Sequence, residues 1–158
     1  MPKKVIPLTD NFLFKVIFSE NEDSLLDLLN SFPDFQGENK IESLKVLNPE
    51  LPKISETDKL SVLDIRAESK KGETFLIEMQ AFREESFPKR ILFYWSKVYA
   101  KTLKKGNHYN LLKKVYSINF TEFNFLDTLK FHSVFQLREK EYSEILLTED
   151  LEIHIIEL

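Results

Sequence analysis

Two apolar stretches decide the fold of this chain, KLSVLDIRA over residues 59–67 and TFLIEMQ over residues 74–80. Both are rich in the Leu, Ile, Val and Phe residues that favour buried β-strands. The short segment between them contains Gly72, which can adopt the left-handed conformation that a hairpin turn needs. Two acidic residues, Asp64 and Glu78, interrupt the apolar stretches. A buried carboxylate is costly unless it is paired or bound to a metal ion, so these two acids need an explanation.

The length of the turn predicts how the two strands pair. A three-residue loop over residues 70–72 places Asp64 opposite Glu78. The same register places Val62 opposite Gln80. Facing residues share one side of a sheet, so Asp64, Glu78 and Gln80 are predicted to converge. A two-residue loop would instead turn Asp64 onto the other, apolar face. The residues predicted for that apolar face are Leu63, Ile65, Ala67, Phe75, Ile77 and Met79.

This pairing has a chemical consequence. Opposed residues of an antiparallel pair have Cα atoms about 4.5–5.5 Å apart. At that spacing the carboxylates of Asp64 and Glu78 can both reach one cation at about 2.0–2.6 Å. The alternative is that the two acids lie on the solvated face of a half-exposed sheet. Against this alternative, Val62 and Leu76 share that face, and like charges directly opposite each other destabilise a sheet. Spacing alone leaves both interpretations open.

Composition excludes several classes of site. The chain has 158 residues, which suits one domain, and no cysteine, which excludes disulfides and thiolate chemistry. With only 3 glycines it has no glycine-rich loop for nucleotide phosphates. The histidines are scattered without metalloprotease or HNH-like spacing, and are predicted to be surface or packing residues. They are His108, His132 and His154.

Charge is distributed unevenly along the chain, although the net charge is −4. Residues 66–114 carry 12 Lys or Arg against 5 Asp or Glu, whereas the segments on either side are acidic. A positive stripe beside an acidic pair attracts phosphates while the acids hold cations, which is what phosphodiester chemistry needs. The alternative is that these basic residues only keep the surface solvated.

The acidic pair also has a familiar spacing. Asp64, followed after thirteen residues by Glu78-Met79-Gln80, resembles the D…(D/E)xK signature of PD-(D/E)XK nucleases, with glutamine in the lysine position. Further motifs match in order: DNFLFKVIF at 10–18, LNPE at 47–50, DKLSVLDI at 58–65, KRILFYW at 89–95, and KG at 105–106 followed by Tyr109. Together they make the chain similar to the PD-(D/E)XK nuclease family transposases, the recombination-promoting nuclease (Rpn, YhgA-like) group. The resemblance runs from about Thr9 to Phe120.

The resemblance implies an α/β fold with a restriction-endonuclease-like core, in which α-helices flank a mixed central β-sheet. The expected elements agree: two short helices within 9–32, a loop at 34–39, strands at 41–47, 59–67 and 74–80, a helix at 87–104, and strands at 113–120, 131–137 and 151–158. Residues 1–158 are expected to form a single nuclease-like domain. Members of the group usually continue further, so a C-terminal extension with DNA-binding or dimerisation elements is expected to be missing.

The activity that the resemblance implies is metal-dependent hydrolysis of DNA by an endonuclease. Asp64, Glu78 and the backbone carbonyl of Met79 would hold Mg²⁺ or Mn²⁺, which activates water and neutralises charge on the phosphate. In related nucleases an acidic residue of the first helix can join the metal site. Asp10 or Glu20 is therefore a candidate third ligand, with capping of the first helix as the alternative role for Asp10.

Gln80 is the departure from the signature. A lysine supplies positive charge and helps to deprotonate water, whereas glutamine can only orient a water or a phosphate oxygen by hydrogen bonding. The transposase-like nucleases commonly carry this glutamine, so inactivity does not follow. The missing positive charge would come from Lys59, Arg90 or Lys97.

The helix expected at residues 87–104 has two distinct faces. Its predicted sheet-facing residues are Ile91, Trp95, Val98 and Thr102. A second face is cationic with one tyrosine, and suits a DNA phosphate backbone. With Lys59, the DNA-binding candidates are Arg90, Tyr94, Lys97 and Lys101. The alternative is that this face only solvates the helix.

DNA is the implied partner, and a homodimer is compatible with the resemblance. No apolar stretch approaches the 18 residues of a membrane span, and no signal peptide is recognised, so the expected location is the cytoplasm. The alternative function is a catalytically degenerate nuclease fold that binds DNA or a protein. A toxin-like or phage-defence nuclease would use the same site residues as a recombination factor.

Overall fold

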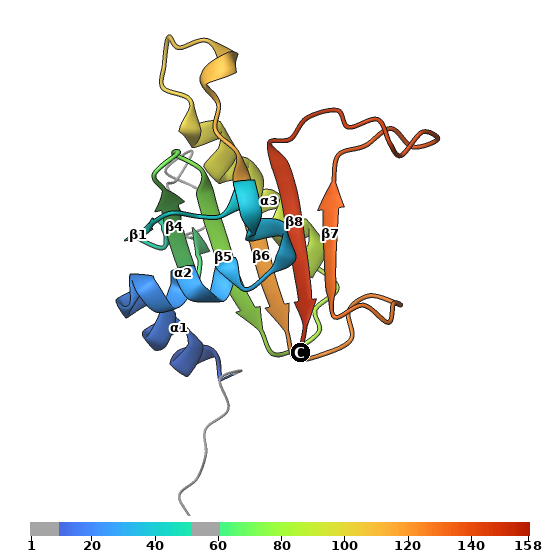
Figure 1. The fold of residues 1–158 in the computed structure, drawn as a ribbon. Helices are drawn as coiled ribbons and strands as arrows, with labels where there is room; N and C mark the ends of the chain where they lie inside the picture. Colours follow the sequence, from blue (N-terminus) through green and yellow to red (C-terminus); the bar gives the residue numbers. More distant parts are fainter. Residues whose placement is uncertain (1–9, 52–60) are drawn as a thin grey trace, which may run out of the picture.

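The computed structural model describes residues 10–51 and 61–158, and its centre is a six-stranded sheet with the strand order β1-β4-β5-β6-β8-β7 (Figure 1). Two short antiparallel strands, β2 and β3, form a separate two-stranded sheet. The strands are β1 (Leu44–Leu47), β2 (Glu50–Leu51), β3 (Ser61–Val62), β4 (Ile65–Ser69), β5 (Thr74–Gln80), β6 (Val115–Thr121), β7 (His132–Gln136) and β8 (Leu151–Glu157).

Helices lie on both faces of the sheet (Figure 1). One face is covered by α1 (Asn11–Glu20), α2 (Glu22–Asn30) and the short 3-10 helices η1 (Pro33–Phe35) and η2 (Gly37–Asn39). The other face is covered by α3 (Phe87–Thr102), which the 3-10 helix η3 (Tyr109–Leu111) follows. Strands β5, β6 and β8 run parallel, β4 and β7 flank them antiparallel, and β1 pairs antiparallel with β4. The predicted mixed sheet flanked by helices is confirmed.

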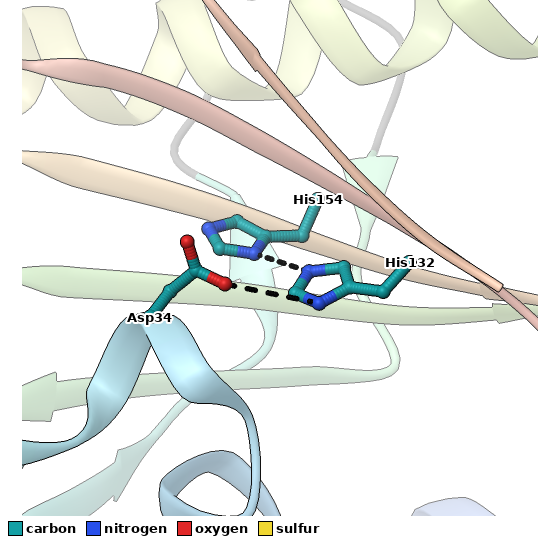
Figure 2. Close-up of side chains that lie close together, drawn as sticks. All are labelled: Asp34, His132 and His154. Carbon is teal, nitrogen blue, oxygen red and sulfur yellow. Dashed lines mark hydrogen bonds and ion pairs between the residues drawn. The ribbon is translucent and has the colours of Figure 1, made fainter. Parts of the chain in front are cut away.

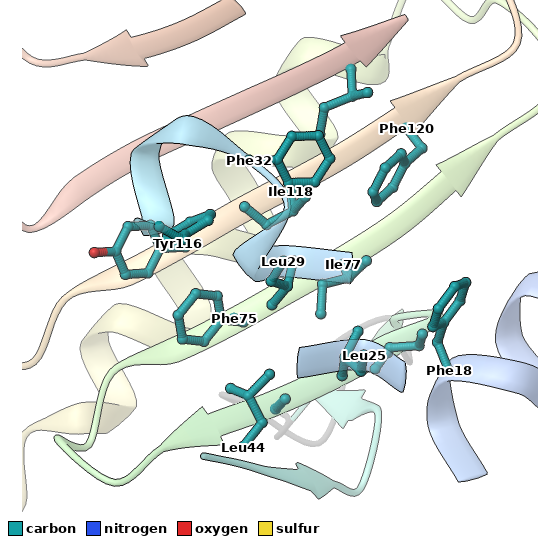
Figure 3. Packing of buried hydrophobic residues seen from close by; sticks show 14 of the residues in the cluster. Phe18, Leu25, Leu29, Phe32, Leu44, Phe75, Ile77, Tyr116, Ile118 and Phe120 are labelled. Atoms are coloured by element: carbon teal, nitrogen blue, oxygen red, sulfur yellow. The ribbon is translucent and has the colours of Figure 1, made fainter. Parts of the chain in front are cut away.

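The main core lies between the sheet and the α1–α2 layer (Figure 3). Leu25 and Leu29 of α2 are completely buried, as the apolar spacing of that helix predicts. Aromatic rings fill the space above β5 and β6, with Phe75 stacked on Tyr116 at 4.7 Å between ring centroids. On the other face, Val98 and Ile91 of α3 are buried as predicted. Burial on both faces explains why every residue of β6 is buried.

The predicted hairpin register is confirmed between β4 and β5. Ile65 pairs with Ile77 and Ala67 pairs with Phe75, which places Asp64 opposite Glu78 by continuation. Gly72 has φ 81°, the left-handed conformation that the three-residue loop requires. The loop closes through a hydrogen bond of 2.9 Å from the Gly72 amide to the Ser69 carbonyl.

The register prediction is wrong on the N-terminal side of Asp64, because the strand breaks there. Residues 61–62 form the separate strand β3, in which Val62 pairs with Glu50 and not with Gln80. Leu63 turns to the α3 side and packs with Leu51 and Leu76, so it does not belong to the apolar layer of Ile65 and Ala67. The Leu63 amide donates instead to the carbonyl of Pro49 at 3.1 Å.

The N-terminal helices begin at polar caps. Asp10 accepts a hydrogen bond from the Leu13 amide at 3.0 Å, and Asn21 accepts one from the Ser24 amide at 3.0 Å. The cap of α1 is therefore Asp10, while Thr9 lies outside the described residues. The loop predicted at 34–39 is more ordered than expected, because it contains η1 and η2. Across residues 10–51 and 61–158, no helix is both long and apolar enough to span a membrane.

Candidate active site at the strand break

Asp64 takes the place of a missing backbone partner. In an unbroken hairpin, the Met79 amide would bond to the carbonyl of Leu63, because residues 65 and 77 form a hydrogen-bonded pair two positions earlier. The chain has turned away at Leu63, and Asp64 Oδ2 accepts from the Met79 amide at 2.9 Å instead. The amide and carbonyl of one strand residue point to the same side, so the Met79 carbonyl also faces the Asp64 side of β5.

Glu78 lies on the α3 face of β5 and is only 8% exposed. Its Oε2 is buried without a hydrogen-bond partner and lies 3.8 Å from Arg90 Nε, which is an ion-pair distance but too long for a hydrogen bond. Burial raises the pKa of Glu78 to about 7 against the opposing effect of Arg90, and the charges of Asp64 and Glu84 add to the rise. The acid pair is therefore only partly compensated by the surrounding protein.

Arg90 is the residue that joins the groups of the site. Its Nη1 donates to Glu84 Oε2 at 3.1 Å, and its Nη2 donates to the Gln80 side-chain oxygen. Gln80 in turn donates through Nε2 to the carbonyl of Phe82 at 2.6 Å. The glutamine that stands in the lysine position is thus held by Arg90, and the guanidinium lies between Gln80 and Glu78. Of the cations proposed from the sequence, Arg90 is placed at the acid pair.

Two further side chains surround the acids. The pKa of Asp64 is raised by burial, against the Met79 hydrogen bond and the positive charges of Lys15 and Arg90. The pKa of the Tyr94 phenol is raised by burial and then by the charge of Glu78. Lys15, on α1, was not among the predicted site residues, because its place in the first helix carries no signal beyond its membership of the opening motif. Asp64, Glu78 and Gln80 converge as predicted.

The proposed DNA-binding residues do not form one open surface. Lys101 is exposed, and Arg90 and Tyr94 are half-buried. Lys97 is only 2% exposed, with its Nζ 5.1 Å from the centroid of the Phe93 ring. Lys59 lies outside the described residues. A feature that the sequence reasoning missed is a basic cleft of about 290 Å³ at the far end of α3. Its basic lining residues are Arg66, Lys101, Lys104 and Lys113.

Comparison with known proteins decides the family. The model of the PD-(D/E)XK nuclease family transposases matches residues 7–158, essentially the whole chain. The chain belongs to this family. No curated protein and no solved structure matches it. Membership indicates a nuclease-type function with DNA as the substrate, and PD-(D/E)XK nucleases generally use divalent metal ions.

The donor set at the strand break suits such an ion. Hard divalent cations prefer carboxylate and carbonyl oxygens, which Asp64, Glu78 and Met79 supply. The buried Glu78 oxygen without a hydrogen bond is the observation that favours a missing cation over a solvated sheet face. Asp10 is exposed and caps α1, and within the described part of the chain no group of three close metal-ligating side chains includes Asp10, Asp64 or Glu78. Glu20 ends α1 as an exposed residue.

Two of the histidines, although far apart in the sequence, are brought together by the fold. His132 Nε2 and His154 Nδ1 lie 2.9 Å apart, and His132 Nδ1 lies 3.8 Å from Asp34 Oδ2 (Figure 2). His154 is completely buried. The strand register brings the two rings together from β7 and β8, on the face of the sheet opposite Glu78. His108 is exposed and His154 packs against Phe35, which agrees with the prediction of surface or packing residues, but the contact between His132 and His154 was not predicted.

Proposed function

We propose that this chain is a metal-dependent DNA endonuclease of the transposase-like, recombination-promoting type. The observation that carries the proposal is the acid pair at the strand break. Glu78 is buried, one of its oxygens has no hydrogen-bond partner, and Asp64 shares its surroundings. A fold gains nothing in stability from two neighbouring, partly compensated carboxylates, so a ligand that needs negative charge explains them better than structure does.

Each residue of the site has a role in the proposal. Asp64, Glu78 and the Met79 carbonyl would hold Mg²⁺ or Mn²⁺. The ion, when bound, supplies an activated water and neutralises charge on the phosphate. Asp64 is held in place by the Met79 amide, so its carboxylate is fixed before any ion or substrate arrives. The raised pKa of Glu78 means that the site takes up a proton readily when no cation is bound.

Arg90 is proposed to replace the lysine of the signature. Its guanidinium keeps a positive charge at every accessible pH, and donates to Gln80 and Glu84. A fixed positive charge beside Glu78 stabilises the extra negative charge that a phosphodiester gains during hydrolysis. Gln80 positions Arg90 and can orient a phosphate oxygen, and Lys15 adds a second positive charge near Asp64. Arg90 cannot act as a base, so proton removal from water is left to the carboxylates.

The test is nicking of supercoiled plasmid by the purified chain with Mg²⁺ or Mn²⁺ and with EDTA. The Asp64→Ala variant removes a proposed ligand, and Asp127→Asn is the matched control, because Asp127 is exposed on the loop after β6. We expect cleavage by the wild type and the control, and loss of cleavage in Asp64→Ala and in EDTA. Cleavage that survives Asp64→Ala would refute the proposal.

A non-catalytic role is the competing function, and one observation favours it. Gln80 replaces the lysine and is bonded at both ends, to Arg90 and to the Phe82 carbonyl. A degenerate nuclease would shift DNA in a gel with steep salt dependence but would not cleave it, whichever divalent ion is added. That combination of results would replace the enzyme with a DNA-binding module.

A further inference from the structure

The histidine cluster described above lies outside the proposed nuclease site. Asp34 comes from η1, His132 from β7 and His154 from β8, so three segments distant in sequence meet there. Within the described residues, this is the group in which three metal-ligating side chains each place a ligand atom within 4.8 Å of the others. The side chain of His132 is 8% exposed and that of Asp34 is 36% exposed, so the cluster reaches solvent on the Asp34 side.

The contacts around His154 decide which of its nitrogens carries the proton. Glu152 Oε2 accepts from Lys114 Nζ at 2.9 Å and from Gln136 Nε2 at 3.2 Å. Glu152 Oε1 lies 3.1 Å from His154 Nε2. A carboxylate ion can only accept, so His154 donates through Nε2 and its Nδ1 keeps a free electron pair. This carboxylate–histidine contact is the arrangement that orients a histidine for a metal ion.

The same reasoning leaves an unsatisfied contact at Asp34. Because His154 Nδ1 is an acceptor, the hydrogen bond between the rings needs the proton of His132 on Nε2. A neutral His132 then presents the electron pair of Nδ1 to Asp34 Oδ2, 3.8 Å away. Two acceptors face each other across this gap. A cation between them, or a second proton on His132, would make the contact favourable.

We propose that Asp34, His132 and His154 bind a divalent transition-metal ion of the zinc class, each residue contributing one ligand atom. Two zinc ligands in tetrahedral geometry are about 3.3 Å apart. The ligand atom of His132 would be Nδ1, which lies 3.8 Å from Asp34 Oδ2, because its Nε2 carries the proton of the hydrogen bond to His154. The three ligand atoms, one from each residue, lie within 4.8 Å of one another, so binding would draw them together by up to about 1.5 Å and would replace the hydrogen bond between the two rings.

The donors also select the kind of ion. Imidazole nitrogens favour zinc, nickel and copper, whereas the all-oxygen set of Asp64, Glu78 and Met79 suits magnesium or manganese. With neutral histidines, Asp34 and Glu152 carry two negative charges against the single positive charge of Lys114, so the site attracts a cation. Aromatic rings pack against the cluster, with Phe35 stacked on His154 at 5.3 Å between centroids. The two metal sites of the chain would therefore differ in selectivity.

The bound ion would connect the helical layer to the edge of the sheet. β7 is one of the two edge strands of the six-stranded sheet, and among its named strands it pairs only with β8. A ligand from η1 and one from each of these strands would fix the edge against the helices. Because binding requires the folded arrangement of all three segments, the ion would stabilise the native state by an amount that grows with the logarithm of its free concentration above Kd.

The test is zinc binding by the Asp64→Ala variant of the full chain, in which the acid pair lacks one ligand. After removal of metals with EDTA and buffer exchange, we expect isothermal titration with Zn²⁺ to give one ion per chain. Zinc at about a hundredfold excess over Kd should raise the melting temperature by about 5–10 °C. Co²⁺ should bind with a visible absorption spectrum typical of nitrogen and oxygen ligands.

Two substitutions identify the ligands. Adding His132→Ala or Asp34→Asn should reduce zinc affinity at least tenfold and remove the thermal shift, whereas His108→Ala should change neither, because His108 is exposed elsewhere. Asp34→Asn keeps the shape of a half-exposed side chain, so it stays informative if His132→Ala does not fold. The proposal is overturned if the chain takes up no stoichiometric zinc, or if both ligand variants bind it as tightly as the control.

Discussion

Glu78 and Glu152 lie in interior strands of the same sheet and are almost equally exposed, at 8% and 7%. Their pKa values nevertheless shift in opposite directions from the ordinary value of a glutamate. Burial raises the pKa of Glu78 to about 7, with Arg90 opposing it. The pKa of Glu152 falls to about 2, because hydrogen bonds from His154 and Lys114 outweigh the effect of burial. Glu152 faces the α1–α2 layer together with Tyr116, and Glu78 faces α3.

The contacts explain the difference. Glu152 accepts hydrogen bonds from Lys114 and Gln136 and contacts His154, all within 3.2 Å. Glu78 has one ion pair at 3.8 Å and an oxygen without a hydrogen bond. A carboxylate that the protein satisfies completely serves the fold, and one that it leaves partly unsatisfied is available to a ligand. The two glutamates should therefore respond differently to the same substitution.

The largest expected effect separates Glu78→Gln from Glu152→Gln. Glu78→Gln should lower the rate of plasmid nicking about 100- to 1000-fold, because it removes a group that holds the proposed ion. It should not destabilise the fold at pH 8. Glu152→Gln should leave nicking within about threefold and lower the free energy of unfolding by about 2 kcal/mol, because Lys114 loses its carboxylate. Nicking rates and urea denaturation measure the two effects.

The opposite pattern would remove the distinction between the two residues. If Glu78→Gln retains nicking while Glu152→Gln loses it in a folded protein, the site has been placed on the wrong face of the sheet. Asp127→Asn is the control for both variants, since an exposed carboxylate should affect neither measurement.

The pH dependence of the free energy of unfolding provides a second test of Glu78. Glu78 ionises at about 7 in the folded protein and near its ordinary value of 4.5 when unfolded. The folded state therefore holds the proton more tightly, and its stability falls as the pH rises from about 4.5 to about 7. In EDTA, Glu78→Gln should be stabilised relative to the wild type by about 2 kcal/mol more at pH 8 than at pH 5. Urea denaturation at the two pH values would measure this stabilisation. If the difference in unfolding free energy between variant and wild type is the same at both pH values, the raised pKa of Glu78 is contradicted.

The next prediction concerns Arg90, the positive charge that pairs with Glu78. Arg90→Ala should lower nicking about 10- to 100-fold, because the charge that replaces the signature lysine is lost. Gln80→Ala should lower the nicking rate by a smaller factor than Arg90→Ala, since Arg90 keeps its hydrogen bond to Glu84 and its ion pair with Glu78. Lys89→Ala, one position earlier on α3 and exposed, is the control. Full cleavage by Arg90→Ala would assign the cation to Lys15 or to another residue.

Local chemistry made the hairpin predictable. The glycine of the turn and the alternation of apolar residues determine the pairing of Asp64 with Glu78, and both are visible in neighbouring residues. The break at Leu63 was not visible, because it depends on pairing with Glu50–Leu51 and on a backbone bond to Pro49. An apolar leucine fits either face of the sheet equally well, so its side is decided by tertiary contacts.

The histidine cluster shows the same limit more strongly. His132 and His154 meet through the register of β7 against β8, and Asp34 comes from the other end of the chain. No short motif contains all three residues, so spacing rules for metal sites do not detect them. Lys97 is a related case, because a basic residue at a helix-surface spacing is buried here beside Phe93.

The smallest expected effect concerns DNA binding along α3. Lys101 is exposed and lines the basic cleft with Arg66, Lys104 and Lys113. Each phosphate contact contributes about 0.9 to the slope of log K against log salt concentration, so Lys101→Ala should lower that slope by about one. The affinity loss should be less than tenfold, because one surface lysine among several carries little of the total. The measurement is a gel shift at several salt concentrations in the Asp64→Ala background, with Lys140→Ala as the control on an exposed loop. If both substitutions reduce the slope equally, DNA is attracted by overall charge, and the α3 face has no special part in binding.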